Sequence, residues 1–228
     1  MEPLQIAIDG PVAAGKGDIA ARLAKACHLI YINTGAMYRM LALACIEKNV
    51  DRSDVKEVLH VLDTVTIDLG APEKNSAKTF VALLDGRDVT DRILDPDVSR
   101  GSSDVAVIPE VRRRMVDLQK HMAQGKAVVM EGRDIGLRVL PHAQLKIYLT
   151  ASVEERSKRR FLQWQEKGIT KSLEETIADT KFRDTQDMTR ATDPLQKLPD
   201  AWELDTTGMT QDEVITTIVK ELERRTLV

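Results

Sequence analysis

Seven residues near the N-terminus, from Gly10 to Lys16, have the spacing G-x-x-x-x-G-K between an apolar run and a helical pattern. Such glycines let successive backbone N–H groups turn inward around phosphate oxygens, and the N-terminus of the next helix adds partial positive charge. The lysine amine then reaches the β and γ phosphates of a nucleotide. We therefore predict an ATP phosphate site formed by Gly10, Pro11, Val12, Ala13, Ala14, Gly15, Lys16, Gly17 and Asp18.

The loop departs from the usual pattern directly after its lysine. A serine or threonine hydroxyl normally stands there, whereas this chain has Gly17 and then Asp18. A carboxylate in the first turn favours the helix dipole by ~0.3–1 kcal/mol. It also repels phosphate and competes with it for the same N–H groups. Because the usual hydroxyl is missing, the sequence predicts no definite metal ligand, and Asp18 is the one candidate for contact with magnesium.

Two further polar segments follow apolar runs. In "NTGAMYR", Thr34 and Gly35 suggest a polar loop where Thr34 donates to a phosphate oxygen and Arg39 binds it bidentately. In "EGRD", Arg133 is suited to phosphate, and Asp134 to an exocyclic amine such as N4 of cytosine. The alternatives are a surface arginine for Arg39 and a solvated turn for the second segment.

A basic stretch begins after Glu155 and contains Arg156, Lys158, Arg159 and Arg160. A second one, "KFRDTQDMTR", places Arg183, Asp187 and Arg190 at i, i+4 and i+7, on one face if it is helical. Such a stripe is usually a solvated, salt-bridged surface. Together with a phosphate loop it favours a lid that supplies cations to a transferring phosphoryl group.

The elements that must position these residues alternate between strands and helices. A helix is expected over 18–25 and another through Cys45, and apolar runs predict five strands: "LQIAI" (4–8), "HLIYI" (28–32), "AVVM" (127–130), "AQLKIYL" (143–149) and "AWELD" (201–205). The alternation predicts an α/β fold with a parallel sheet covered on both faces. Ligands collect at the carboxyl ends of such strands, where three of the polar segments lie.

Residues 51 to about 100 break the alternation. "VTIDL" and "TFVALLDG" predict short strands around the turn "GAPEKNSAK", followed by a loop-like segment, "GRDVTDRILDPDVS". We interpret this region as a small antiparallel insertion. Helix starts with a capping-box pattern are expected at Ser152, Ser172 and Thr210.

Composition restricts the class of partner. The 228 residues carry 33 Lys and Arg against 36 Asp and Glu, a net charge of −3, so nothing global indicates a nucleic acid polymer or an anionic membrane. No apolar run approaches the ~20 residues that span a bilayer. Cys27 and Cys45 have no metal-ligand spacing and are expected to be buried apolar residues. We expect a reduced, cytoplasmic protein.

The ordered set of motifs resembles the bacterial cytidylate kinase family, within the nucleoside monophosphate kinases. The matching stretches span nearly the whole chain: "IAIDGPVAAGKG", "NTGAMYR", "DVSRGSSDVAVIPEVR", "EGRDIG", "PHAQLKIYLTASVEERSKRR", "QEKG", "RDTQDMTRA" and "ELDTT". The resemblance implies a phosphate-loop (P-loop) kinase core with a central five-stranded parallel sheet flanked by helices. It also implies an antiparallel insertion at about 53–100 that binds the nucleoside monophosphate, and a helical lid at about 154–190. The core then covers 1–52, 101–153 and 191–228.

The resemblance further implies transfer of the γ-phosphoryl group of ATP, with Mg²⁺, to CMP or dCMP by a monomer. Arg159 would join the loop in binding ATP, and the catalytic group would be Lys16, Arg133, Arg183 and Arg190. The residues implied for CMP are Thr34, Arg39, Ser103, Arg112, Arg133, Asp134, Arg183, Asp187 and Arg190. Asp18, Asn33, Leu94 and Leu137 depart from the family pattern. A catalytically weakened nucleotide-binding protein and a kinase of UMP or another small acceptor remain the alternatives.

Overall fold

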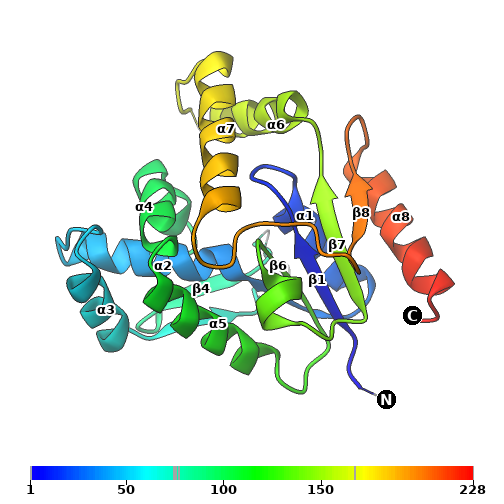
Figure 1. Ribbon diagram of the computed structural model, residues 1–228, viewed down its shortest axis with the longest axis horizontal. Helices are drawn as coiled ribbons and strands as arrows, with labels where there is room; N and C mark the ends of the chain where they lie inside the picture. Colours follow the sequence, from blue (N-terminus) through cyan, green and yellow to red (C-terminus); the bar gives the residue numbers. More distant parts are fainter. Residues whose placement is uncertain (1, 74–75, 77, 167, 228) are drawn as a thin grey trace. The chain divides into compact units, whose positions relative to one another are not determined.

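The computed structural model describes residues 2–73, 76, 78–166 and 168–227. These residues form two compact units, and Figure 1 shows their helices and strands coloured along the chain. The first unit consists of residues 1–30 and 125–228, and the second of residues 31–124.

A five-stranded parallel sheet with the strand order β2-β6-β1-β7-β8 forms the centre of the fold. Central β1 pairs in parallel with β6 and β7, and β8 pairs in parallel with β7. Ile6, Ala7 and Ile8 of β1 are fully buried, as expected where helices flank the sheet. Each predicted run overlaps one strand, which confirms the α/β class; the strands are β1 (Gln5–Asp9), β2 (Ile30–Asn33), β6 (Val128–Gly132), β7 (Leu145–Thr150) and β8 (Trp202–Asp205).

The described residues of the first unit also form the helices α1 (Lys16–Ala26), α6 (Val153–Glu166), α7 (Leu173–Thr189) and α8 (Gln211–Arg224) and a π-helical turn, η2 (Ile135–Val139). The capping boxes expected at Ser172 and Thr210 are both present. At the start of α6, the Ser152 hydroxyl accepts from the Glu155 N–H at 3.2 Å. Helices α6 and α7 lie side by side (Figure 1).

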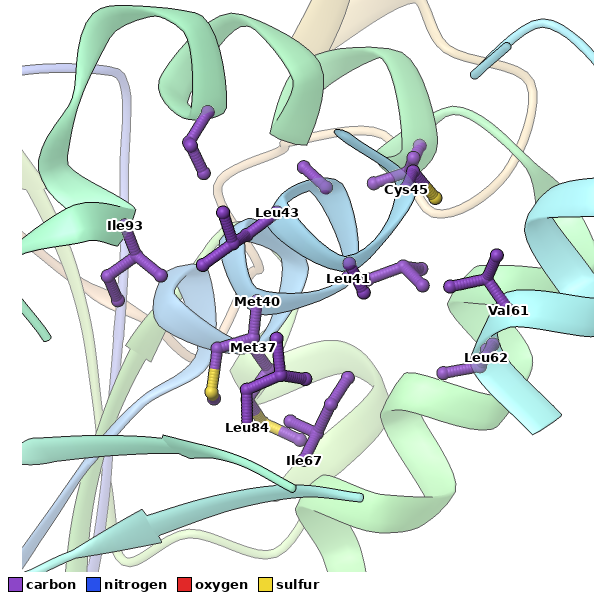
Figure 2. Close-up of a cluster of buried hydrophobic side chains, with 14 of the residues drawn as sticks. Met37, Met40, Leu41, Leu43, Cys45, Val61, Leu62, Ile67, Leu84 and Ile93 are labelled. Atoms are coloured by element: carbon purple, nitrogen blue, oxygen red, sulfur yellow. The ribbon is translucent and has the colours of Figure 1, made fainter. Parts of the chain in front are cut away.

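The second unit packs helices around α2 and a three-stranded antiparallel sheet. Met37, Met40 and Leu41 of α2 are fully buried in its hydrophobic core, where they meet side chains of α3 and of the small sheet (Figure 2). The elements are α2 (Thr34–Glu47), α3 (Val55–Thr64), β3 (Ile67–Gly70), β4 (Val81–Leu84), β5 (Arg87–Asp88), η1 (Arg92–Leu94), α4 (Pro96–Ala106) and α5 (Pro109–Ala123).

Strands β3 and β4 confirm the two short antiparallel strands expected within residues 51–100, whereas the expected loop-like segment is wrong. Helix α3 was not expected; the Asp54 side chain caps it by accepting from the N–H groups of Lys56 and Glu57. The segment expected to be a loop forms η1 and the start of α4, where Pro96 suits the first helical turn. Residues 74, 75 and 77 of the expected turn, and residue 167 of "QEKG", lie outside the described residues.

Two smaller expectations also need correction. Thr34 and Gly35 do not form a polar loop, because α2 begins at Thr34, with the Asn33 side chain accepting from the Ala36 N–H at 3.0 Å. Of the two free cysteines, Cys45 is buried as expected, whereas Cys27 is only partly buried.

Candidate active site

The predicted phosphate loop connects β1 to α1. A Cβ atom on Gly10 would lie 2.0 Å from the carbonyl oxygen of Leu149, so only glycine fits beside β7. Gly15 has a φ of 86° and is the N-cap of α1, without a side chain to accept from the N–H groups of the first turn. The sequence therefore produces a helix N-terminus open to an anion.

Lys16 is buried at the first position of α1, with 5% of its surface exposed. Its Nζ donates to the carbonyl oxygen of Pro11 at 2.7 Å, which places the amine over the loop. Burial and, to a smaller extent, the charge of Arg133 together lower the pKa of Lys16 to about 7, against the opposing effect of Glu131. A phosphate at this position would favour the protonated amine.

Asp9, the last residue of β1, links the phosphate loop to the second predicted motif. Its two carboxylate oxygens accept from the N–H groups of Ile135 and Gly136, each at 2.8 Å. Burial raises the pKa of Asp9 to about 6, although these two hydrogen bonds lower it. The carboxylate thus fixes the segment after β6 that carries Arg133 and Asp134.

Four charged residues predicted for the site form a continuous network. Arg133 Nε donates to Asp187 Oδ2 at 2.5 Å. Arg190 places NH1 3.8 Å from the other oxygen of Asp187 and NH2 3.4 Å from Asp134 Oδ1. Burial raises the pKa of Asp187, but the charges of Arg133 and Arg190 outweigh it and hold that pKa below its usual range.

Helix α7 supplies part of this network. Asp187 lies on α7 as expected. Arg190 was expected on the same helix face, but it is the C-cap of α7 and lies just after the last helical residue. The Arg190 guanidinium also donates through Nε to the carbonyl oxygen of Asp193 at 2.8 Å. Arg183 lies on the same helix and is partly buried.

A second ion pair, between Arg156 of α6 and Asp184 of α7, contacts the phosphate loop. The two side chains are 5% and 11% exposed, and Arg156 NH1 lies 2.6 Å from Asp184 Oδ2. The Val12 N–H donates to Asp184 Oδ1 at 3.0 Å, and Arg156 NH1 donates to the Val12 carbonyl oxygen at 3.0 Å. Both helices therefore contact the backbone of one loop residue.

Arg159, predicted for ATP, lies on α6, and its guanidinium contacts Thr206 directly after β8. Its Nε donates to Glu155 at 2.9 Å, and its two terminal nitrogens donate to the hydroxyl and carbonyl oxygens of Thr206 at 3.2 and 2.8 Å. These contacts fix the plane of the guanidinium.

The remaining predicted residues belong to the second unit. Thr34 is buried at the start of α2, and Arg39 is partly buried on the same helix. Arg112 of α5 is 2% exposed, with its guanidinium carbon 5.8 Å from the centre of the Tyr38 ring. Ser103 lies on α4 and is partly buried. This unit therefore brings Arg112 against α2 by a cation–π contact.

Comparison with known proteins finds relatives over nearly the whole chain. The family model described as "Cytidylate kinase" matches residues 6–224. A cytidylate kinase of Caldicellulosiruptor saccharolyticus is 44% identical over 220 residues, which are 96% of each chain. One of Lactobacillus johnsonii is 44% identical over 222 residues, which are 97% of this chain and 95% of that protein. The chain belongs to the cytidylate kinase family.

Membership in the cytidylate kinase family makes the chain a nucleoside monophosphate kinase. A crystal structure of an uncharacterised protein from Eubacterium ventriosum shares the fold, with a TM-score of 0.54, 12% identity and coverage of 98% of this chain and 99% of that one. Within the described residues, no helix has the length and hydrophobicity needed to cross a lipid bilayer.

Three residues of the candidate site were not predicted from the sequence. Asp9 had a signal, since it is a carboxylate placed directly between a buried strand and the loop. Arg156 was noted only as part of a basic run, and Asp184 was not singled out. Their roles depend on contacts between segments far apart in the chain.

Proposed function

We propose that the chain transfers the γ-phosphoryl group of ATP to CMP or dCMP, giving ADP and CDP or dCDP. The observation that carries this proposal is the presence of two kinds of phosphate-binding group in one unit. Lys16 lies in the loop after β1, and the network of Arg133, Asp187, Arg190 and Asp134 lies after β6 and along α7. A protein that only binds nucleotide has no need for the second set.

In this proposal the side chains align phosphates and neutralise charge. The loop N–H groups and Lys16 bind the donor phosphates, while Arg133, with Arg39 and Arg183, holds the acceptor phosphate or the transferring group. No general base is needed, because the attacking atom is already an anionic phosphate oxygen. Catalysis then rests on alignment and electrostatic stabilisation.

Magnesium is part of the proposal as an ion carried on ATP. Within the described residues no group of three or more His, Cys, Asp or Glu side chains could hold a metal. Mg²⁺ does not require such a group of side chains. It usually keeps several waters and is bound by substrate phosphates together with one or two carboxylates. Asp18, exposed in the first turn of α1, is the candidate carboxylate for contact with the ion. When bound, the ion would neutralise charge on the β and γ phosphates.

Base selection in this proposal rests on Asp134, with Ser103 and Arg112 as further base-binding residues. The carboxylate is 10% exposed and accepts from Arg190, so it is fixed and shielded from water. Cytosine offers it the N4 amine, whereas uracil offers a carbonyl oxygen. The repulsion between this carbonyl oxygen and the carboxylate should weaken the binding of UMP relative to CMP by ~1–3 kcal/mol.

The test is purified protein with ATP, Mg²⁺ and each of CMP, dCMP, UMP, AMP and GMP in turn. We expect CDP and dCDP, with kcat/KM for UMP lower by about 5- to 150-fold, which corresponds to that penalty. Preference for UMP would favour the alternative acceptor. Binding of ATP without any diphosphate product would favour the catalytically weakened protein.

Replacing Asp18 by threonine is expected to lower the KM for ATP. The carboxylate repels the phosphates at the start of α1, and a threonine hydroxyl removes that repulsion while supplying the oxygen usual at such loops. Steady-state kinetics with varied ATP measure the change. A fall in kcat with unchanged KM would instead mean that Asp18 positions magnesium.

We expect the protein to take up a proton when it binds ATP at about pH 8. Without nucleotide, the pKa of Lys16 is about 7, so its amine is mostly neutral there; phosphate charges raise that pKa, and the amine becomes protonated on binding. Titration calorimetry in buffers of different ionisation enthalpy measures the uptake. Lys16→Arg, which stays protonated, is the matched control and should show none.

We also propose that the kinase works as a cytoplasmic monomer without a nucleic acid polymer or a membrane as partner. The near-balanced charge of 33 basic and 36 acidic residues supports this. Sedimentation at several protein concentrations tests the oligomeric state.

A further inference from the structure

The backbone of Val12 is held on both sides by the ion pair of Arg156 and Asp184. Its N–H donates to Asp184 Oδ1 at 3.0 Å, and its carbonyl oxygen accepts from Arg156 NH1 at 3.0 Å. The ring closes through Arg156 NH1 and Asp184 Oδ2, 2.6 Å apart. Arg156 Nε also donates to the carbonyl oxygen of Ala151 at 2.8 Å, which anchors the ring to the end of β7.

The next residue, Ala13, has an unfavourable backbone conformation. Its φ of 58° lies in the left-handed region, which an alanine side chain disfavours by steric contact with the backbone. Such a conformation persists only where surrounding contacts determine it. The ring at Val12 supplies two fixed contacts immediately before the strained residue, and the helix start at Gly15 and Lys16 fixes the chain after it.

We propose that Arg156 and Asp184 are positioning residues that hold the phosphate loop in its anion-binding conformation before the nucleotide arrives. The Val12 N–H is directed to Asp184, so the pair acts by fixing the loop backbone and thereby the left-handed Ala13. This inference rests on the proposed function, in which the loop binds the phosphates of ATP.

The ring also joins the loop to the acceptor side of the site. Asp184 and Asp187 are three residues apart on α7 and so lie on neighbouring positions of one helix face. The first binds Val12, and the second binds Arg133. Helix α7 therefore contacts each group of phosphate-binding residues through a different carboxylate.

A double-mutant cycle with Asp184→Asn and Ala13→Gly tests the proposal. Asparagine keeps the shape of the carboxylate but removes the charge that holds Arg156, so we expect the free loop to relax. Part of the binding free energy of ATP is then used to return Ala13 to the left-handed region. We expect the Kd for ATP, measured by calorimetry without acceptor, to rise about tenfold. Glycine adopts positive φ readily, so in the Ala13→Gly background the same change should raise the Kd less than about threefold.

Three further measurements separate positioning from general destabilisation. Asp179→Asn, a matched change on α7 at a carboxylate paired with Lys171, should leave the Kd unchanged. Arg156→Lys keeps the charge but cannot reach all three oxygens, and should weaken ATP binding as Asp184→Asn does. In steady-state kinetics, the KM for ATP should rise while the KM for CMP stays within about twofold.

An unchanged Kd in Asp184→Asn would overturn the proposal, and so would an equal effect in the wild-type and Ala13→Gly backgrounds. If Asp184→Asn does not fold, the cycle is run with Arg156→Lys and the same criteria apply. The binding readout needs no phosphoryl transfer. The positioning role of Arg156 and Asp184 can therefore be refuted without refuting the proposed function. The proposed function itself would be refuted by wild-type protein that makes no CDP.

Discussion

Replacing Lys16 by methionine is expected to lower kcat by about 10²- to 10³-fold, the loss typical for one preorganised donor at a reacting group. Lys16 is 5% exposed, and its amine is fixed over the loop by the Pro11 carbonyl oxygen. Methionine has a similar unbranched shape, so it should preserve packing while removing the charge. Initial rates with saturating ATP and CMP measure the effect.

The matched control for this change is Lys25→Met, in the last turn of the same helix, where the lysine is exposed. Its kcat should equal that of the wild type. If Lys16→Met retained kcat within about threefold, the assignment of the loop as the donor site would be wrong.

Replacing Arg133 by glutamine should also lower kcat by about 10²- to 10³-fold. Arg133 lies directly after β6, and Asp9 fixes the backbone of the following turn. Glutamine removes the charge that neutralises the transferring group and also leaves Asp187 without its 2.5 Å partner. The melting temperature should therefore fall together with kcat.

The double variant Arg133→Gln with Asp187→Asn separates these two effects. Removing both charges should restore much of the lost melting temperature, because the carboxylate that lost its 2.5 Å partner is then replaced by a neutral amide. Its kcat should stay low, since the cation is still missing. Recovery of kcat in the double variant would mean that Arg133 acts only through stability. Arg22→Gln, at an exposed ion pair with Asp212, is the control and should change neither quantity appreciably.

The strands and the phosphate loop could be predicted because their signals are local. Apolar runs of four or more residues that end at polar or glycine-containing segments indicate the strands. The spacing of Gly10, Gly15 and Lys16 is typical of a phosphate-binding loop. Helix α3 had a local signal too. Asp54 precedes Glu57 by three residues, and Val58, Val61 and Leu62 recur at helical spacing, but the strand interpretation of the neighbouring residues concealed it.

The contacts that fix the site could not be predicted in this way. Val12 and Asp184 are separated by 172 positions, and only the folded chain selects Asp184 among the acidic residues of α7. Arg156 is one of several cations in its run, and burial distinguishes it from its neighbours. The division into core, insertion and lid, and the roles of the individual site residues, stay predictions.

Phosphoryl transfer to CMP can be measured by following the transferred group itself. Wild-type protein is incubated with CMP, Mg²⁺ and ATP labelled in the γ-phosphoryl group, and the nucleotides are separated. The label should appear in the β-phosphate of CDP, with one ADP formed for each CDP. Label found only in inorganic phosphate, or in no product at all, would contradict the proposed function.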